Sequence, residues 1–205
     1  EGFPVLLSIA LFLGMMRMMK RHVKVHNLSV IEKLGRTSVI CFDKNDLLEV
    51  SQDEDIKKVI EFCQKAQIKP ILMSVDEMLD LNMVKEFGIL CEGDEILSGC
   101  ELDRLSDGEL LEYIEKIAVY TGVTMEHKIR IVKTWQRKRH VVVISGDGMK
   151  DAPILKVADV ACAMGKTAKD VADITITDKS ILSMMSIIKA GRGIYAHLIE
   201  MQSFS

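Results

Sequence analysis

Short apolar runs alternate with amphipathic segments along most of this 205-residue chain, and this alternation limits the folds open to it. The segments between the runs place apolar side chains three or four residues apart, which is typical of one helix face. Strands that alternate with such helices predict an α/β fold, a doubly wound parallel sheet with helices on both faces. The expected strands lie at residues 37–42, 70–73, 118–120, 141–144, 160–164 and 174–176.

Polar residues mark the expected starts of several helices. Ser106 and Glu109 have the spacing of a capping box, and Thr124 is a candidate N-cap for the helix that follows it. Apolar positions between residues 78 and 87 indicate a further helix that stops at Gly88.

Acidic residues lie just past the ends of two of the expected strands. Asp43 follows the run at 37–42, and Asp147 lies in the block SGDGMKDAP at residues 145–153. Ligands of parallel sheets bind beyond the carboxyl ends of the strands, where these carboxylates would meet. Carboxylates are suitable ligands for Mg²⁺, and glycines let a phosphate approach the backbone. The pattern therefore indicates metal-assisted phosphoryl transfer.

Composition excludes some classes of function. The net charge of −3 gives no electrostatic reason to expect nucleic acid as a partner. Hydrophobic residues make up 48% of the chain and charged residues 28%, which is typical of a globular domain. The cysteines form no C-x-x-C pair, which favours reduced thiols in a cytosolic compartment. They are Cys41, Cys63, Cys91, Cys100 and Cys162.

The N-terminus has a different character. Residues 3–16 are uncharged and strongly apolar, and the basic residues Arg17, Lys20, Arg21 and Lys24 follow them. As a helix, this run would reach roughly 21 Å, which is short of the ~30 Å hydrocarbon core of a bilayer. Two interpretations remain open: the cytoplasmic half of a transmembrane helix, and a buried helix of a soluble domain.

Several motifs resemble those of the P-type cation-transporting ATPases, and they occur in that family's order. The block at 145–153 resembles the hinge motif G-D-G-x-N-D-A-P. Residues 40–44 (ICFDK) resemble the phosphorylation motif C-S-D-K-T-G-T, residues 73–76 (MSVD) resemble T-G-D, and residues 126–128 (EHK) resemble the end of P-x-H-K. The resemblance favours the calcium-pump branch, especially its secretory-pathway type.

This resemblance implies a haloacid-dehalogenase-like fold and a set of roles. Asp43 would accept a phosphoryl group as an aspartyl phosphate, and Lys128 would contact the phosphoryl oxygens. The family's catalytic positions correspond to Asp43, Lys44, Ser74, Asp76 and Lys128. Mg²⁺ would be the cofactor, with Asp43, Asn45, Asp147 and Asp151 as its expected ligands or their supports.

The resemblance also implies a domain organisation. Residues 1–4 (EGFP) and 193–195 (GIY) are similar to parts of the family's fourth and fifth transmembrane helices. The expected parts are a half-helix at 1–20, a stalk linker at 21–36, the phosphorylation domain at 37–190 and the next helix at 191–205. Glu1 matches an ion-binding glutamate, but it would lack partner ligands here. The expected location is the membrane, with the main domain on the cytoplasmic side.

One family element is missing between two motifs. Asp43 and Asp76 are 33 residues apart, which is enough for one helix and one strand, whereas the family inserts a nucleotide-binding domain there. We therefore expect ATP as a partner only if a nucleotide domain is supplied elsewhere. The expected partners are the membrane and other pump segments or an intact pump, and not nucleic acid.

Three departures from the motifs concern the chemistry. The family's T-G-T becomes Asn45-Asp46-Leu47, the glycine of T-G-D becomes Val75, and the asparagine of the hinge motif becomes Lys150. These changes suggest a degenerate phosphorylation domain with weak or lost chemistry. The alternatives are a non-catalytic binding module derived from a pump, and a stand-alone Mg²⁺-dependent phosphatase. The phosphatase is the weaker alternative, because Asn45 stands where that superfamily usually carries an acid.

Overall fold

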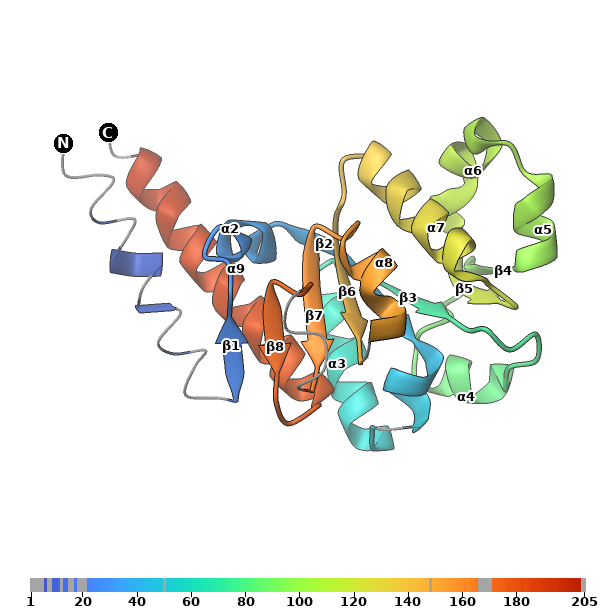
Figure 1. Cartoon of the computed structure of the whole chain (residues 1–205), viewed down its shortest axis with the longest axis horizontal. Helices are drawn as coiled ribbons and strands as arrows, with labels where there is room; N and C mark the ends of the chain where they lie inside the picture. The colour runs from blue at the N-terminus through green and yellow to red at the C-terminus, as the bar shows by residue number, and fades with distance from the viewer. Residues whose placement is uncertain are drawn as a thin grey trace.

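The structure is a computed structural model that describes residues 6, 9–11, 13, 14, 17, 22–49, 51–147, 149–165 and 171–203. In this part of the chain, eight strands form one sheet in the order β1-β8-β7-β6-β2-β3-β5-β4 (Figure 1). β1 pairs antiparallel with β8, and the remaining pairs are parallel. The strands are β1 (Val23–Val25), β2 (Thr37–Asp43), β3 (Lys69–Met73), β4 (Glu95–Ser98), β5 (Ile117–Thr121), β6 (Val141–Gly146), β7 (Val160–Met164) and β8 (Ile174–Ile176).

Helices cover both faces of the sheet, and each face has its own apolar core. Neighbouring residues of β2 show the alternation: Ile40 and Phe42 belong to one core, and Val39 and Cys41 to the other. The first core includes α2 (Val30–Gly35), α3 (Asp53–Lys65), α4 (Leu81–Glu86) and α9 (Ile181–Ser203). The second includes α5 (Gly99–Arg104), α6 (Asp107–Tyr113), α7 (Met125–Arg137) and α8 (Ala152–Leu155). The predicted α/β parallel-sheet class is therefore confirmed.

Helix α9 packs closely against α2, and Figure 1 shows the two helices together at the left of the sheet. A Cβ atom on Gly191 would lie 2.5 Å from Cβ of Leu34, and one on Gly35 would lie 2.3 Å from Cβ of Tyr195. Arg192 of α9 donates through Nη2 to the backbone oxygen of Thr37 over 2.8 Å. The long C-terminal helix is thus attached to the beginning of the strand that ends at Asp43.

All six expected strands and both expected helix caps are present, and the differences lie elsewhere. The side chains of Ser106 and Glu109 form the predicted capping box, and Thr124 caps α7. The helix expected between 78 and 87 begins only at Leu81, because Asp80 accepts hydrogen bonds from the first-turn N–H groups. Met78 is 89% exposed and takes no part in it. Strands β1 and β4 were not expected from the sequence.

Two of the expected domain boundaries fall within parts of the chain that belong to the folded domain. The stalk linker proposed at 21–36 contains β1 and α2, which join the sheet and its helical layer. The junction between residues 190 and 191 lies inside α9. Among the described residues, no helix is both long and apolar enough to cross a membrane. Glu1 and most of the expected half-helix at 1–20 lie outside the described residues.

Candidate functional site

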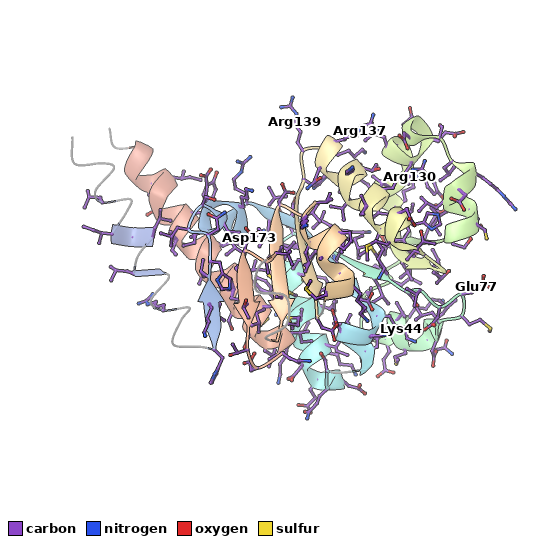
Figure 2. The ribbon with its side chains drawn as sticks, in the orientation of Figure 1. Lys44, Glu77, Arg130, Arg137, Arg139 and Asp173 are labelled. Atoms are coloured by element: carbon purple, nitrogen blue, oxygen red, sulfur yellow. The ribbon has the colours of Figure 1, made fainter. Side chains whose placement is uncertain are left out.

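Three neighbouring strands carry the predicted site at their carboxyl ends. β6, β2 and β3 are adjacent in the sheet and parallel to one another. Asp43 is the last residue of β2, Ser74 follows β3, and Asp147 follows β6. Figure 2 shows Lys44 at this end of the sheet, whereas Arg137 and Arg139 lie at the opposite end. The parallel topology therefore brings together residues that are about a hundred positions apart in the sequence.

Asp43 is paired with a buried lysine from another element. Nζ of Lys128, on α7, donates to Oδ2 of Asp43 over 2.5 Å. The Lys128 side chain is only 7% exposed, against 25% for Asp43. The other carboxylate oxygen, Oδ1, accepts a 3.0 Å hydrogen bond from the backbone N–H of Asn45. Both oxygens of the expected nucleophile are thus engaged within the site.

Lys44 and Asp76 form a second ion pair beside the first. Nζ of Lys44 lies 2.6 Å from Oδ2 of Asp76, and the two side chains are 22% and 50% exposed. Ser74 is fully buried, and its hydroxyl oxygen accepts the backbone N–H of Asp76 over 3.0 Å. Ser74 therefore fixes the turn that presents Asp76, and its own hydroxyl hydrogen remains available for donation.

Asp151 supports the backbone at Asp147. Its Oδ2 accepts a 3.2 Å hydrogen bond from the backbone N–H of Asp147. Gly146 allows this approach, because a Cβ atom there would lie 2.9 Å from Cβ of Asp151. Burial raises the pKa of Asp151, and the hydrogen bond from Asp147 opposes that effect. Asp151 thus serves the loop after β6 and has a carboxyl group with increased proton affinity.

Asp46 joins the acidic residues of the site, and its burial was not predictable from the sequence. It lies in the π-helical turn η1 (Asn45–Glu49), and its Oδ2 is buried without a hydrogen-bond partner among the described residues. Burial, followed by the charges of Asp43, Asp147 and Asp151, raises the pKa of Asp46 to about 7. The sequence identified Asp46 only as a departure from a motif, because its burial depends on how η1 folds over the site.

The site contains the oxygen ligands that a hard cation prefers, but they are not arranged around a common point. Asp43, Asp147 and Asp151 supply carboxylate oxygens, and the Asn45 side chain supplies an amide oxygen, which are the donors that Mg²⁺ prefers. Within the described ranges, no group of three or more His, Cys, Asp and Glu side chains is placed to hold a metal ion. The unpartnered buried oxygen of Asp46 is an additional acceptor beside these residues.

The fold and the site define a class of protein. A parallel α/β domain carries an aspartate at the end of a central strand, with a buried lysine on it and acidic loops from the neighbouring strands. A similar fold occurs in the solved catalytic domain of the CPx-ATPase CopB-B. The TM-score is 0.56 at 16% sequence identity, over 85% of this chain and 98% of that one. At this level of identity, the likeness concerns the fold alone.

Sequence comparison identifies the family, although no family model matches the chain. The chain is 36% identical over 181 residues to "Calcium-transporting ATPase 1" of Lactococcus lactis, which spans 83% of this chain and 21% of that protein. It is 39% identical over 149 residues to "Calcium-transporting ATPase 1" of Bacillus cereus, spanning 70% and 17%. For the protein of the same name in Saccharomyces cerevisiae, identity is 31% over 157 residues, spanning 73% and 16%.

The chain belongs to the P-type cation-transporting ATPases and is related to calcium-transporting members. The matched regions span about a fifth of the length of these relatives. The predicted family is therefore confirmed by sequence.

Proposed function

We propose that this chain is a phosphorylation domain of the haloacid-dehalogenase-like type from a P-type calcium or cation pump, with weak or lost aspartyl-phosphate chemistry. The observation that carries the second part is Asp46. Burial raises the pKa of its carboxyl group, and the charges of Asp43, Asp147 and Asp151 act in the same direction, so that the pKa reaches about 7.

The residues support a definite reaction at Asp43. An oxygen of Asp43 would form a bond to phosphorus while the bond from phosphorus to the leaving oxygen breaks, and the leaving oxygen keeps the electron pair. Lys128 and Lys44 would offset negative charge on the transferred group, and the Ser74 hydroxyl would donate to one of its oxygens. Mg²⁺, when bound, would neutralise further charge on the phosphoryl group. Asp43 and Asp147 with the Asn45 amide oxygen would hold the ion, and Asp151 would support the Asp147 loop.

Asp46 opposes this reaction by its charge. Above pH 7 it adds a carboxylate beside the point where a dianionic phosphoryl group must arrive, and like charges repel strongly in a partly buried site. Lys150 is exposed, and its charge lowers the pKa of Asp46 without cancelling the effect of burial and the three carboxylates. The Val75 side chain is 60% exposed, so much of its added bulk faces solvent.

A nucleotide donor is not supported within this domain. Between Asp43 and Asp76, the described residues form only η1, α3 and β3. We therefore propose that ATP acts only through a nucleotide domain supplied elsewhere. The proposed setting is the membrane, with the main domain on the cytoplasmic side and other pump segments or an intact pump as partners.

A non-catalytic regulatory module is the second candidate, and the charge arrangement favours it over a phosphatase. The ion pair with Lys128 and the hydrogen bond from Asn45 engage both oxygens of Asp43 without any ligand. Such a site can persist as structure after its chemistry has been lost. The phosphatase reading has no acid at Asn45 to serve as general acid or base.

Acyl-phosphate labelling tests the proposal. The chain is incubated with Mg²⁺ and labelled acetyl phosphate, which needs no nucleotide domain, and protein-bound label is counted after an acid quench. We expect little label on the parent chain and more on Asp46→Gly, all of it labile to hydroxylamine and absent from Asp43→Asn. Asp53→Asn, which changes an exposed acid at the start of α3, is the matched control and should behave as the parent.

Each outcome separates the candidates. Stoichiometric label on the parent chain would refute the weakened chemistry and indicate a working phosphorylation domain. No label on any variant, with the fold intact, would favour the non-catalytic module. Catalytic turnover of a generic phosphate ester would instead support the phosphatase.

A further inference from the structure

His127 connects the functional lysine to a separate helix. Nδ1 of His127 accepts the backbone N–H of Thr124 over 3.2 Å, while the backbone N–H of His127 donates to Oγ1 of Thr124 over 3.3 Å. Because Nδ1 is an acceptor here, the neutral ring carries its hydrogen on Nε2. That Nε2–H points to Oδ1 of Asp103 at 2.8 Å, on α5. The ring therefore closes the first turn of α7 and anchors it to α5.

The contact between α5 and α7 is tight at more than one level. At the start of α5, a Cβ atom on Gly99 would lie 3.0 Å from Nδ1 of His127. One turn further along α7, the Arg130 guanidinium donates to the backbone oxygens of Leu102 and Leu105, over 2.7 and 2.5 Å. Helix α5 thus fixes both the direction and the rotation of the first turns of α7.

Lys128 takes its position from this first turn. Its backbone N–H donates to the oxygen of Thr124 over 3.0 Å, which is the first hydrogen bond within α7. Its long side chain then reaches Asp43 through a mostly buried path. A flexible lysine side chain keeps a single partner best when its backbone is fixed.

We propose that Asp103 and His127 are positioning residues that hold the first turn of α7 so that Lys128 meets Asp43. Asp103 lies outside the site, and its side chain is 67% exposed, whereas that of His127 is 13% exposed. The inference depends on the proposed function only in treating the Asp43–Lys128 contact as functional. The contact itself can be tested whether or not Asp43 accepts phosphate.

Zero-length cross-linking measures the contact directly. A water-soluble carbodiimide converts a carboxylate into an O-acylisourea. An adjacent amine attacks its acyl carbon, so an amide bond forms and the reagent leaves as a urea. Peptide mass spectrometry then compares the Asp43–Lys128 cross-link with the Lys44–Asp76 cross-link in the same molecules. The second pair has a similar N–O distance and does not involve α7, so it is an internal standard.

Substitutions at the α5–α7 contact distinguish positioning from general stability. Asp103→Ala removes the acceptor, and we expect the ratio of the two cross-links to fall at least roughly threefold, consistent with the loss of one hydrogen bond. Asp103→Asn keeps an acceptor oxygen and should restore the ratio. His127→Gln can still cap Thr124 but gives up the imidazole bridge to Asp103, so it should resemble Asp103→Ala.

Asp107→Ala is the matched control. Asp107, on α6, has a similarly exposed carboxylate, which is paired with Arg130 of α7 over 2.9 Å. It should leave the ratio unchanged, because Arg130 keeps its bonds to the two backbone oxygens. An unchanged ratio in both Asp103→Ala and His127→Gln, with Asp43–Lys128 still cross-linked, would overturn the proposal. Absence of that cross-link from the parent chain would overturn it as well.

Discussion

Replacing Asp46 by asparagine should change how the stability of this domain depends on pH. Asp46 is partly withdrawn from water, and its Oδ2 has no hydrogen-bond partner among the described residues. Burial, together with the charges of Asp43, Asp147 and Asp151, raises its pKa from 3.8 to about 7. At pH 8 the folded chain must therefore keep a carboxylate charged in surroundings that favour its neutral form.

The sign of the effect follows from proton binding. Between pH 4 and 7 the folded chain holds a proton on Asp46 that the unfolded chain has released, so the free energy of unfolding falls by about 1.4 kcal/mol per pH unit. The full interval from 3.8 to about 7 would give about 4 kcal/mol, and remaining access to water reduces this to about 2–3 kcal/mol. The stabilisation is complete below the unfolded pKa and is lost as the pH rises through the folded pKa.

Urea unfolding at intervals from pH 4 to 8 measures this difference. Asp46→Asn should be close to the parent chain at pH 4 and more stable by about 2–3 kcal/mol at pH 8, because the amide never carries the charge. Asp53→Asn, which changes an acid at an exposed position, is the control variant. Parallel curves for the parent and Asp46→Asn would refute the reasoning, because they would show that Asp46 titrates alike in both states.

Three further predictions concern other parts of the molecule. Lys128→Met should lower the free energy of unfolding by about 2 kcal/mol in urea titrations, because it leaves Asp43 without its buried cation. Lys44→Met, in the more exposed pair, should lower it by less than about 1 kcal/mol, and equal losses would contradict the difference in burial. Gly191→Ala should destabilise the fold by about 1–3 kcal/mol because its Cβ would meet Leu34, and Gly193→Ala should stabilise it by about 0.5–1 kcal/mol because nothing lies within 4 Å of its Cβ. If the melting temperatures of the two variants moved in the same direction, the result would argue against the α2–α9 packing. A thiol-reactive chromogenic reagent should modify the exposed Cys91 and Cys100 rapidly and the other cysteines only on unfolding. Cys41, Cys63 and Cys162 are buried, and burial raises their thiol pKa to about 12, so a third rapidly modified thiol would contradict this burial.

The strength of the apolar signal decided which strands were predictable. The run at 141–144 is followed by a glycine-containing loop, and β6 occupies the centre of the sheet with both faces covered. β4 lies at the edge, and only Leu97 of its residues is buried, so no apolar run marks it. The helix was predicted to include Met78 because of its spacing, but an apolar residue at helical spacing can also lie exposed in a loop.

The site shows a similar division. The family motifs indicated that Asp43 and Lys128 act together, and the structure places them in contact. The motifs gave no indication that His127 and Asp103 would join α7 to α5, because residues on different helices meet only through tertiary packing. The proton affinity of Asp46 was equally hidden, since it depends on burial and on charges from three other loop or strand-end positions.

The positions of the departures explain how chemistry and fold can separate in this chain. Asn45, Asp46, Val75 and Lys150 all follow strand ends or lie in short turns at one edge of the sheet. The strands that they follow, β2, β3 and β6, contribute buried apolar side chains to both cores, and these four positions belong to neither core. Stability therefore exerts little restraint on these four residues, apart from the cost of burying charge. Below pH 7 a proton on Asp46 avoids most of that cost, whereas above pH 7 the proposed repulsion of phosphate comes together with a loss of stability.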